Sequence, residues 1–596
     1  MRTIQNLTVV VMLFMSLFLK AQTVQWKHIS SSSSIPNYQT NYIIDDSNNI
    51  VHLFIAFTSG TYTLYGKTLG PYPNNRNFGV ASVYPNGETK WNLVFSGTNG
   101  LSSFSPRSIT TDGLNYYIVY TSVDTLILRK NNVISDTILQ ARSLRDLNLI
   151  KINNNGELVW VRTMKSLSNF NVSFPVLLSY DPLSKTIRGG VSVFDSAQID
   201  IDENSSIKYV SDRNYRISKC GSGIAQSTFL FAYDENGKLK KSRVVKNDIT
   251  VNTFLHSFQA GMLFVYPCDT SNIDGIPIRD SVSNYFALDS GLRFKLLAQI
   301  PKYPNINIKF TKGANVSVSS RSELFLTPQG DSLRLGNNAF QHSPFEVLSY
   351  DNNNQLIRRK ILFPLSATDS VRITFESQVI HKEFIYLSGR GVNGSKLRKT
   401  LVFDGISYTL NPSSQFSFFM KLDKLLNVLW VNFNFINNTA PPFYERLGID
   451  KEGNLLFNGS VNGNNQFPLL NDSLSRTNYP YSFMVKVRDQ TITRGEVVSG
   501  PYCAGDTLLI PYTTTGVFNN NNQFIAQLSN ADGSFDDTTQ IYELGRITAN
   551  KADTITGILP LFQVLSSPNY RIRIISTSPI VQSFYKLDSL KLLIYS

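Results

Sequence analysis

The sequence is poor in the residues that hold a fold together by covalent or metal bonds. Among 596 residues there are three cysteines and five histidines. No two histidines have the spacing of a metal-binding pair, so we predict no metal site. With so few cysteines, packing rather than disulfides must supply the stability of an exported protein. A disulfide between Cys220 and Cys268 stays open, and Cys503 is expected to be a buried lone thiol.

Long apolar runs are also scarce. The one run of interest, from Leu7 to Leu19, has 13 residues, fewer than the roughly 20 that a spanning helix needs. It follows Arg2 and precedes Ala21, which is the pattern of a secretory signal peptide cleaved after Ala21. A membrane anchor is the alternative. We therefore predict export across the inner membrane, to the periplasm, the cell surface or the medium, with no transmembrane segment.

The formal net charge of +13 is unevenly distributed. Residues 498–596 carry six basic and seven acidic groups, so the basic excess lies before them. An exported basic protein can meet anionic glycans or a lipid surface, and we expect no nucleic-acid partner in this compartment. The charges are dispersed, which also fits a role in solubility alone.

The four tryptophans occupy one position of an imperfect repeat. Three repeats read FGVASVYPNGETKW, DLNLIKINNNGELVW and FFMKLDKLLNVLW, each a strand, a polar turn and a second strand. Aromatic and β-branched residues suit pleated faces, and Asn-Gly suits tight turns. This pattern predicts an all-β protein. The tryptophans are Trp26, Trp91, Trp160 and Trp430.

Three further copies of the hairpin place another residue where the tryptophan stands. They put Lys241, Phe294 and Arg358 there, which gives seven outer strands spaced 53 to 81 residues apart. A second hairpin lies upstream, so each unit has four strands. Units of this size without helical pattern predict a β-propeller, in which Trp26, Trp91, Trp160, Phe294 and Trp430 pack between blades.

The last unit lacks its own outer strand. Its third strand begins at Tyr481, and the segment after it has no strand of the required kind. The N-terminal segment Thr23 to Ser30 supplies the missing strand, which would remove the open edge of the ring. We therefore predict a seven-bladed β-propeller over residues 22–491, closed by the N-terminal strand.

The repeats GVASVYPNGETKW and NLIKINNNGELVW resemble the SBBP-type β-propeller repeat, over about residues 22–491. The resemblance implies an exported or surface protein and says little about activity. Lys241 and Arg358 depart from its outer tryptophan.

The pattern of apolar and polar residues changes after a short predicted linker, residues 492–500. Residues 501–596 alternate apolar and polar positions in about seven short strands, which predicts a β-sandwich. The segment resembles the immunoglobulin-like modules of Bacteroidetes surface proteins, which share the run Cys503 to Asp506. It has one cysteine and no tryptophan, so the disulfide-based subtype is excluded.

No catalytic set and no cofactor site can be assigned from the sequence. Aspartates such as Asp45 and Asp450 end the first strand of their units and are interpreted as turn formers. The segment Asp200 to Asn204 spaces oxygen ligands as a calcium loop does, but lacks the glycine and distal glutamate. Carboxylates could still meet in a propeller channel.

A recurring triplet of Asp, Ser or Thr, and an apolar residue resembles the O-glycosylation sequon of Bacteroidetes exported proteins. Its alternative is turn chemistry at the start of strands. The candidate acceptors include Thr125, Thr137, Ser196, Ser332 and Ser473.

Two long excursions, Asp200 to Ser227 and Arg390 to Ser417, are expected on one face of the ring. Their basic residues could form a rim for an anionic ligand, or lie in solvated loops. We expect a monomeric, non-catalytic binding or adhesion protein whose partner is a glycan or a cell-envelope protein. A polysaccharide-active hydrolase or lyase, or an envelope scaffold, is the alternative. The rim residues are Arg213, Tyr215, Arg216, Lys219, Arg390, Lys396, Arg398 and Lys399.

Overall fold

A computed structural model shows an all-β protein, with no helix among the described residues. The described part comprises the strands named below and connecting residues 45–49, 70, 84–88, 112–115, 125, 131, 153–157, 182–185, 201–205, 235–238, 291–293, 426–427, 450–454, 489–490, 495–498, 504–506, 516–522, 529–535, 541, 549–552, 559–561, 569–571, 577–578 and 580–582.

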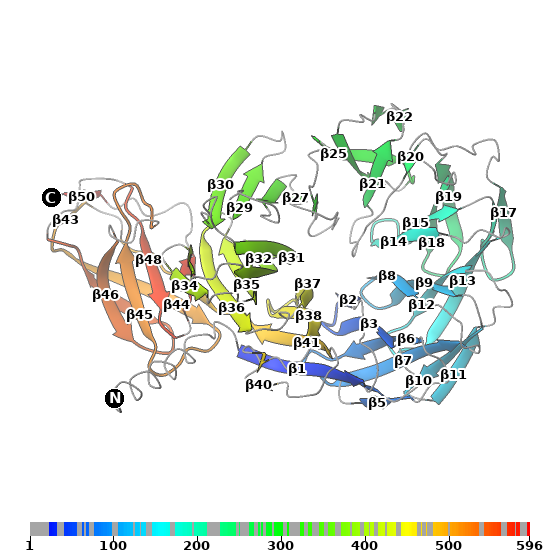
Figure 1. Ribbon diagram of the computed structural model, residues 1–596, viewed down its shortest axis with the longest axis horizontal. Coiled ribbons are helices and arrows are strands. Elements are labelled where there is room, and N and C mark those ends of the chain that lie inside the picture. Colours follow the sequence, from blue (N-terminus) through cyan, green and yellow to red (C-terminus); the bar gives the residue numbers. More distant parts are fainter. Residues whose placement is uncertain are drawn as a thin grey trace.

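Seven sheets follow one another in chain order along a curved row (Figure 1). Each is numbered by its order in the chain. Sheet 1 contains β2 (Asn41–Ile44), β3 (Ile50–Ala56), β6 (Asn77–Val83) and β7 (Thr89–Gly97). Sheet 2 contains β8 (Ser105–Thr111), β9 (Tyr116–Ser122), β12 (Asp146–Ile152) and β13 (Leu158–Ser166). Sheet 3 contains β14 (Ser173–Asp181), β15 (Thr186–Val193), β18 (Ser227–Asp234) and β19 (Leu239–Val245).

Sheet 4 contains β20 (Ile249–Thr250), β21 (Met262–Pro267), β24 (Val282–Leu288) and β25 (Phe294–Pro301). Sheet 5 contains β26 (Asn307–Ile308), β27 (Ser322–Leu326), β28 (Ser332–Gly336), β29 (Phe345–Tyr350) and β30 (Leu356–Phe363). Sheet 6 contains β31 (Val371–His381), β32 (Phe384–Asn393), β35 (Gln415–Asp423) and β36 (Val428–Ile436). In sheet 5, β26 pairs with β27 in parallel, and the other pairs are antiparallel.

Sheet 7 is built from both ends of this region. It contains β37 (Phe443–Ile449), β38 (Leu455–Val461) and β41 (Tyr481–Arg488), and its fourth strand is β1 (Thr23–Ser32). The register of β1 on β41 runs from Thr23 opposite Arg488 to Ser30 opposite Ser482. The predicted pairing of the N-terminal strand with the strand from Tyr481 is therefore observed.

The units contain more strands than the four predicted. A hairpin inserted between the second and third strands of sheets 1, 2 and 3 pairs with the fourth strand of the preceding sheet: β4 pairs with β1, β10 with β7, and β16 with β13. Sheets 7, 1 and 2 become six-stranded in this way. The hairpins are β4 (Tyr62–Leu64) with β5 (Lys67–Leu69), β10 (Leu126–Lys130) with β11 (Val133–Ile138), and β16 (Ser196–Asp200) with β17 (Ser206–Val210).

Three more hairpins occupy the same place in sheets 4, 6 and 7 but form two-stranded sheets of their own. They are β22 (Asn272–Ile273) with β23 (Ile276–Pro277), β33 (Lys399–Phe403) with β34 (Ile406–Leu410), and β39 (Gln466–Phe467) with β40 (Asp472–Ser473).

Where its side chains are described, the third strand of a sheet is buried on both faces. All seven residues of β6 are buried, as are eight of the nine in β35. A strand reaches this state only when its sheet lies between two others, which explains why these strands are apolar rather than alternating. Shared clusters confirm the stacking: Phe78 and Phe95 of sheet 1 pack against Tyr120 of sheet 2.

The C-terminal strands form two facing sheets. Tyr512 of the first and Phe524 of the second are in contact, with ring centroids 4.6 Å apart. β42 begins before and ends within the segment predicted as a linker. The first sheet has β47 (Asp553–Ile558), β44 (Thr507–Thr515), β42 (Thr491–Arg494) and β49 (Ser583–Phe584); the second has β46 (Tyr542–Thr548), β45 (Gln523–Leu528) and β48 (Ile572–Ser576); β43 (Pro501–Cys503) pairs with β50 (Leu593–Tyr595).

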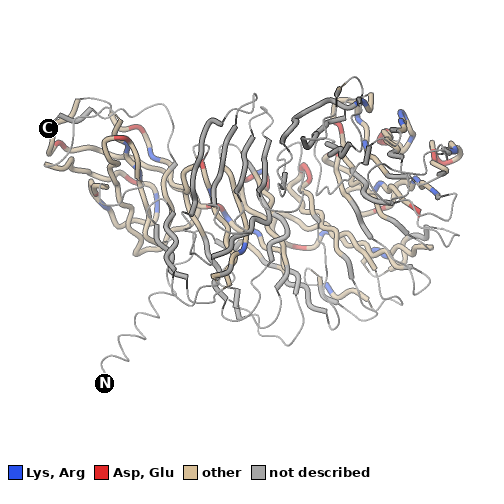
Figure 2. The backbone as a smooth tube through the Cα atoms, turned by 45° about the horizontal axis from the view of Figure 1, so that its top comes forward, with Lys and Arg blue, Asp and Glu red and all other residues tan. Residues whose placement is uncertain are grey.

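Figure 2 shows lysine, arginine and acidic residues scattered along the described backbone rather than gathered in one patch.

Candidate functional site

Three tryptophans bind the tight turn of the next sheet. The indole Nε1 of Trp26 donates to Pro85 O at 2.9 Å, and that of Trp91 donates to Asn154 O at 2.9 Å. Trp160 Nε1 donates to Glu235 O at 3.0 Å. Each indole also lies on the glycine two residues after its acceptor, where an added Cβ would come within 2.6 to 2.9 Å of the ring; these glycines are Gly87, Gly156 and Gly237.

A lysine opposite the tryptophan strengthens two of these contacts. Lys486 is the cross-strand partner of Trp26, and its Nζ also donates to Pro85 O, at 3.2 Å. Lys151 is the partner of Trp160 and donates to Glu235 O at 2.9 Å. We call such a pair, donating to one turn carbonyl, a lysine–tryptophan clamp. It holds consecutive sheets together by hydrogen bonds as well as by apolar packing.

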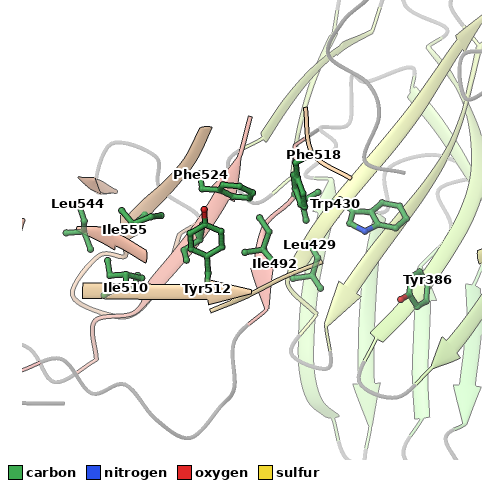
Figure 3. Close-up of a cluster of buried hydrophobic side chains, with 14 of the residues drawn as sticks. Tyr386, Leu429, Trp430, Ile492, Ile510, Tyr512, Phe518, Phe524, Leu544 and Ile555 are labelled. Carbon is green, nitrogen blue, oxygen red and sulfur yellow. The ribbon is translucent and has the colours of Figure 1, made fainter. Parts of the chain in front are cut away.

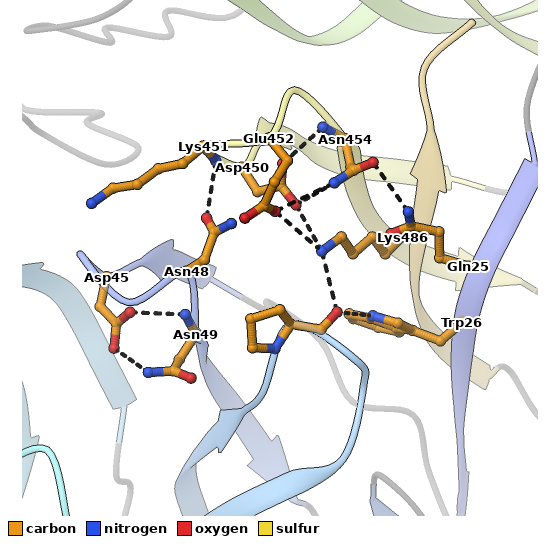
Figure 4. A network of polar contacts seen from close by, with 11 residues as sticks. Gln25, Trp26, Asp45, Asn48, Asn49, Asp450, Lys451, Glu452, Asn454 and Lys486 are labelled. Carbon is orange, nitrogen blue, oxygen red and sulfur yellow. Dashed lines mark hydrogen bonds and ion pairs between the residues drawn. The ribbon is translucent and has the colours of Figure 1, made fainter. Parts of the chain in front are cut away.

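A network of polar contacts lies at the seam between sheets 7 and 1 (Figure 4). Lys486 Nζ lies 2.7 Å from Asp450 Oδ2, with side chains only 4% and 1% exposed. Asn454 donates to both oxygens of this carboxylate. Burial alone would raise the pKa of Asp450, but the hydrogen bonds from Lys486 and Asn454 hold it below its usual value.

Other contacts cross the same seam. The Tyr42 hydroxyl of sheet 1 donates to Leu456 O of sheet 7 at 2.9 Å. The backbone amide of Lys451 donates to Asn48 Oδ1 at 2.9 Å, and its Nζ forms an ion pair with Asp46. The first and last sheets are thus joined by side chains as well as by β1.

The aspartates at the ends of first strands serve their turns. Asp45 accepts hydrogen bonds from the amides of Ser47 and Asn49, and from the Tyr116 hydroxyl of sheet 2 at 2.7 Å. Burial, followed by the interaction with Asp45, raises the pKa of Tyr116, so this hydroxyl is a donor and not a nucleophile. The turn interpretation of these aspartates agrees with this geometry.

In the segment considered as a calcium loop, Asp200 to Asn204, the carboxylates also accept hydrogen bonds from backbone amides. Asp200 Oδ2 accepts the amide of Thr163 at 2.8 Å, and Asp202 accepts hydrogen bonds within its own turn. In the described part of the chain, no group of three potential metal-ligating side chains comes together.

Trp430 departs from the pattern. It is fully buried, but among the described residues its Nε1 has no acceptor. The reason is that β41 does not turn back into its own fourth strand, so sheet 7 lacks the tight turn that the other tryptophans bind. The opposite lysine, Lys421, pairs instead with Asp489 at 2.5 Å, and the Tyr386 hydroxyl donates to Asp489 at 2.7 Å. Burial lowers the pKa of Lys421 despite the opposing charge of Asp489.

The C-terminal sheets occupy the place of the missing turn (Figure 3). Trp430 belongs to the same apolar cluster as Ile492 and Phe518. The amide of Gln582 donates to Leu429 O at 2.7 Å, which joins the backbone of the C-terminal part to β36. The C-terminal part is therefore packed on sheet 6.

The predicted basic rim falls mostly outside the described residues. Arg390 is exposed on β32. Lys399 begins β33, and its side chain lies outside the description. The rim stays a prediction, as does the packing role of Phe294, which begins β25. The rim residues wholly outside are Arg213, Tyr215, Arg216, Lys219, Lys396 and Arg398.

The candidate glycosylation acceptors lie at both ends of strands: Ser196 and Ser332 begin a strand, whereas Thr137 and Ser473 lie near or at the end of one. Thr125 directly precedes β10 and is half-buried. The other acceptors stand within strands, with side chains outside the description: Thr137 in β11, Ser196 in β16, Ser332 in β28 and Ser473 in β40.

Cys503 corrects one expectation. We predicted a buried thiol, but Cys503 is exposed and free. It ends the short strand β43, in which Tyr502 packs against the core while the side chain of Cys503 is exposed, and its amide is held by Asp506. Cys220, Cys268 and the predicted signal peptide, residues 1–21, lie outside the described residues. In the described part of the chain, we find no helix of the length and hydropathy of a membrane span.

The clamp lysines were missed as functional residues. Their signal was present, because each stands in the third strand of its repeat, as in LIKINNNGELVW. No protein family, no curated protein and no solved structure matches the chain.

Proposed function

We propose that residues 22–491 form a seven-bladed β-propeller closed by β1, and that residues 501–596 form an immunoglobulin-like module on it. The support is the pairing of β1 with β41 in sheet 7 and with β4 of the first inserted hairpin. The third strands buried on both faces agree with blades stacked around an axis.

We infer that the protein is an exported, non-catalytic binding or adhesion protein, with a glycan or an envelope protein as its partner. The observation that carries this is how differently the two ends of the sheets are built. At one end, short turns are used for clamps and carboxylate-centred hydrogen bonds, as at Pro85 and Asp45. The connections between second and third strands leave from the other end, and in sheets 1 to 4, 6 and 7 they are enlarged by a hairpin.

An enlarged loop set on a rigid scaffold is the usual place of a binding surface. The basic excursions belong to these connections, because they also join second and third strands. The chemistry of guanidinium and ammonium groups suits an anionic glycan.

A glycan array with the mature protein tests the proposal, followed by a turnover assay on each polymer retained. We expect retention of acidic polysaccharides without release of new chain ends. Replacing Arg390, Lys396, Arg398 and Lys399 together by serine should reduce retention. The matched control replaces Lys185 and Lys238, exposed in turns at the opposite end, by serine.

Two outcomes would contradict the proposal. Release of new chain ends would indicate a hydrolase or lyase. Equal loss of retention in both variants would indicate a general effect of charge rather than a rim.

A further inference from the structure

The outward side of the first C-terminal sheet carries no charge. Along β44 the buried residues Leu508, Ile510 and Tyr512 point into the core, so the alternate residues point outward. The same alternation holds in β42 and β47. We call the outward set the threonine face: Thr491, Thr493, Thr507, Leu509, Pro511, Thr513, Thr515, Thr554, Thr556 and Ile558.

The strand register joins these residues into one surface. Thr493 lies opposite Thr513, and Leu509 lies opposite Thr556. Leu509 is 64% exposed, and Ile558, a diagonal neighbour across the strands, is 58% exposed. Hydroxyl and methyl groups therefore alternate with exposed aliphatic side chains across three adjacent strands.

Such a surface is unusual for a face in contact with water only. Solvent-facing strands commonly carry charges, and edge strands are commonly protected by lysine. β47 is the edge strand of this sheet, and on this face it carries no charged residue and no protecting lysine. Depletion of charge together with exposed aliphatic residues is typical of the centre of a protein interface.

The distribution of charge along the chain favours a second copy of this chain as the partner of the threonine face. Two copies of a chain with net charge +13 repel each other wherever their basic parts meet. Residues 498–596 carry six basic and seven acidic groups, so this part can approach a second copy without that repulsion. An interface about a two-fold axis must also match itself, which an uncharged face does without placing like charges together.

We propose that the threonine face is the docking surface for a second copy of this chain, in a symmetric dimer with the two sheets packed face to face. This goes beyond the proposed function and differs from the monomer expected from the sequence. It would place two binding platforms on one particle, which raises apparent affinity for a repetitive polymer.

Analytical ultracentrifugation of the mature protein across the micromolar range tests the dimer. We expect a reversible monomer–dimer equilibrium. The double variant Leu509→Lys and Thr556→Lys should weaken it at least about tenfold, because it places four ammonium groups in one interface. The control is Thr548→Lys on β46, exposed on the other sheet of the same module, which should dimerise as the wild type does.

Circular dichroism and the melting profile of each variant show that loss of dimer is not loss of fold. A wild-type protein that stays monomeric throughout that range overturns the proposal. So does a folded double variant that dimerises as strongly as the wild type, because its contact would then lie elsewhere. Retention of the monomer on an uncharged polysaccharide through this face would assign the surface to a different ligand.

Discussion

At the scale of single residues, the tight turns depend on glycine for two separate reasons. Gly156 has a φ of +78°, and an added Cβ would lie 2.6 Å from the ring of Trp91. Replacing Gly156 by Ala should therefore cost about 1–2 kcal/mol for the left-handed backbone and about 1–3 kcal/mol for overpacking. Chemical denaturation of the full chain measures the sum.

Gly453 is the matched control. Its φ is +86°, but nothing lies within 4 Å of the position that a Cβ would take. The change of Gly453 to Ala should show the backbone cost alone. If both variants lose the same stability, contact with the indole does not require glycine.

Lys486 illustrates the cost of breaking a buried ion pair. Changing Lys486 to Met would leave the carboxylate of Asp450 buried without its partner, and should destabilise the protein by about 3–5 kcal/mol. The double variant with Asp450→Asn should recover part of this loss. A double-mutant cycle by urea denaturation measures the coupling, and additive losses would contradict it.

His52 should make stability depend on pH. It is buried next to Phe54, and burial lowers its pKa from 6.5 to about 3. Between these two values the unfolded chain binds a proton that the native protein does not. Stability from this group is complete above pH 6.5 and falls by up to about 1.4 kcal/mol per pH unit as the pH drops towards 3.

Replacing His52 by Gln should remove this part of the slope. Denaturant titrations at several pH values compare the variant with the wild type. An unchanged slope between pH 6.5 and pH 4 would show that His52 is already protonated in the folded protein.

At the scale of elements, β1 has two partners, β41 and β4. Deleting Thr23–Ser32 would leave both as open edges and remove the Trp26 clamp at Pro85. We expect an aggregating product. Size-exclusion chromatography with light scattering measures it, and a soluble monomer with a cooperative melt would contradict the role of β1.

Elements joined by local signals could be predicted from the sequence. The hairpin from Asn77 to Gly97 was predictable because its Asn-Gly turn and the two strands that the turn joins are close in sequence. The pairing of β1 could be inferred because one unit lacked a strand. The crossing of β10 onto β7 could not, since no local pattern tells which sheet edge a hairpin will reach.

The same reasoning explains the misses within sites. In the sequence, Lys486 has the pattern of a solvent-facing lysine. Its acceptor, Pro85 O, belongs to another sheet far away in the chain, so no local pattern reveals the contact. Cys503 was expected to be buried, but in the three-residue strand β43 it is Tyr502 that packs against the core, and Cys503 is exposed.

At the scale of the whole molecule, sheets 6 and 7 share one apolar cluster with the C-terminal module. We therefore expect these parts to unfold together. Calorimetry of the full chain should show no separate transition for the module, and Phe518→Ala, which removes a buried ring at the junction, should lower the main transition. A module that melts on its own, with the rest unchanged, would contradict this coupling.

The position of β1 as the fourth strand of sheet 7 also affects the order in which the protein folds. Thr23 meets Arg488 across 465 positions of chain, so β1 can complete sheet 7 only after β41 has been made, although its other partner, β4, is close in sequence. Until then β41 has no partner on that side, and such distant pairing is slow. An edge that stays open this late in folding can pair with another chain, so slow closure exposes the protein to aggregation.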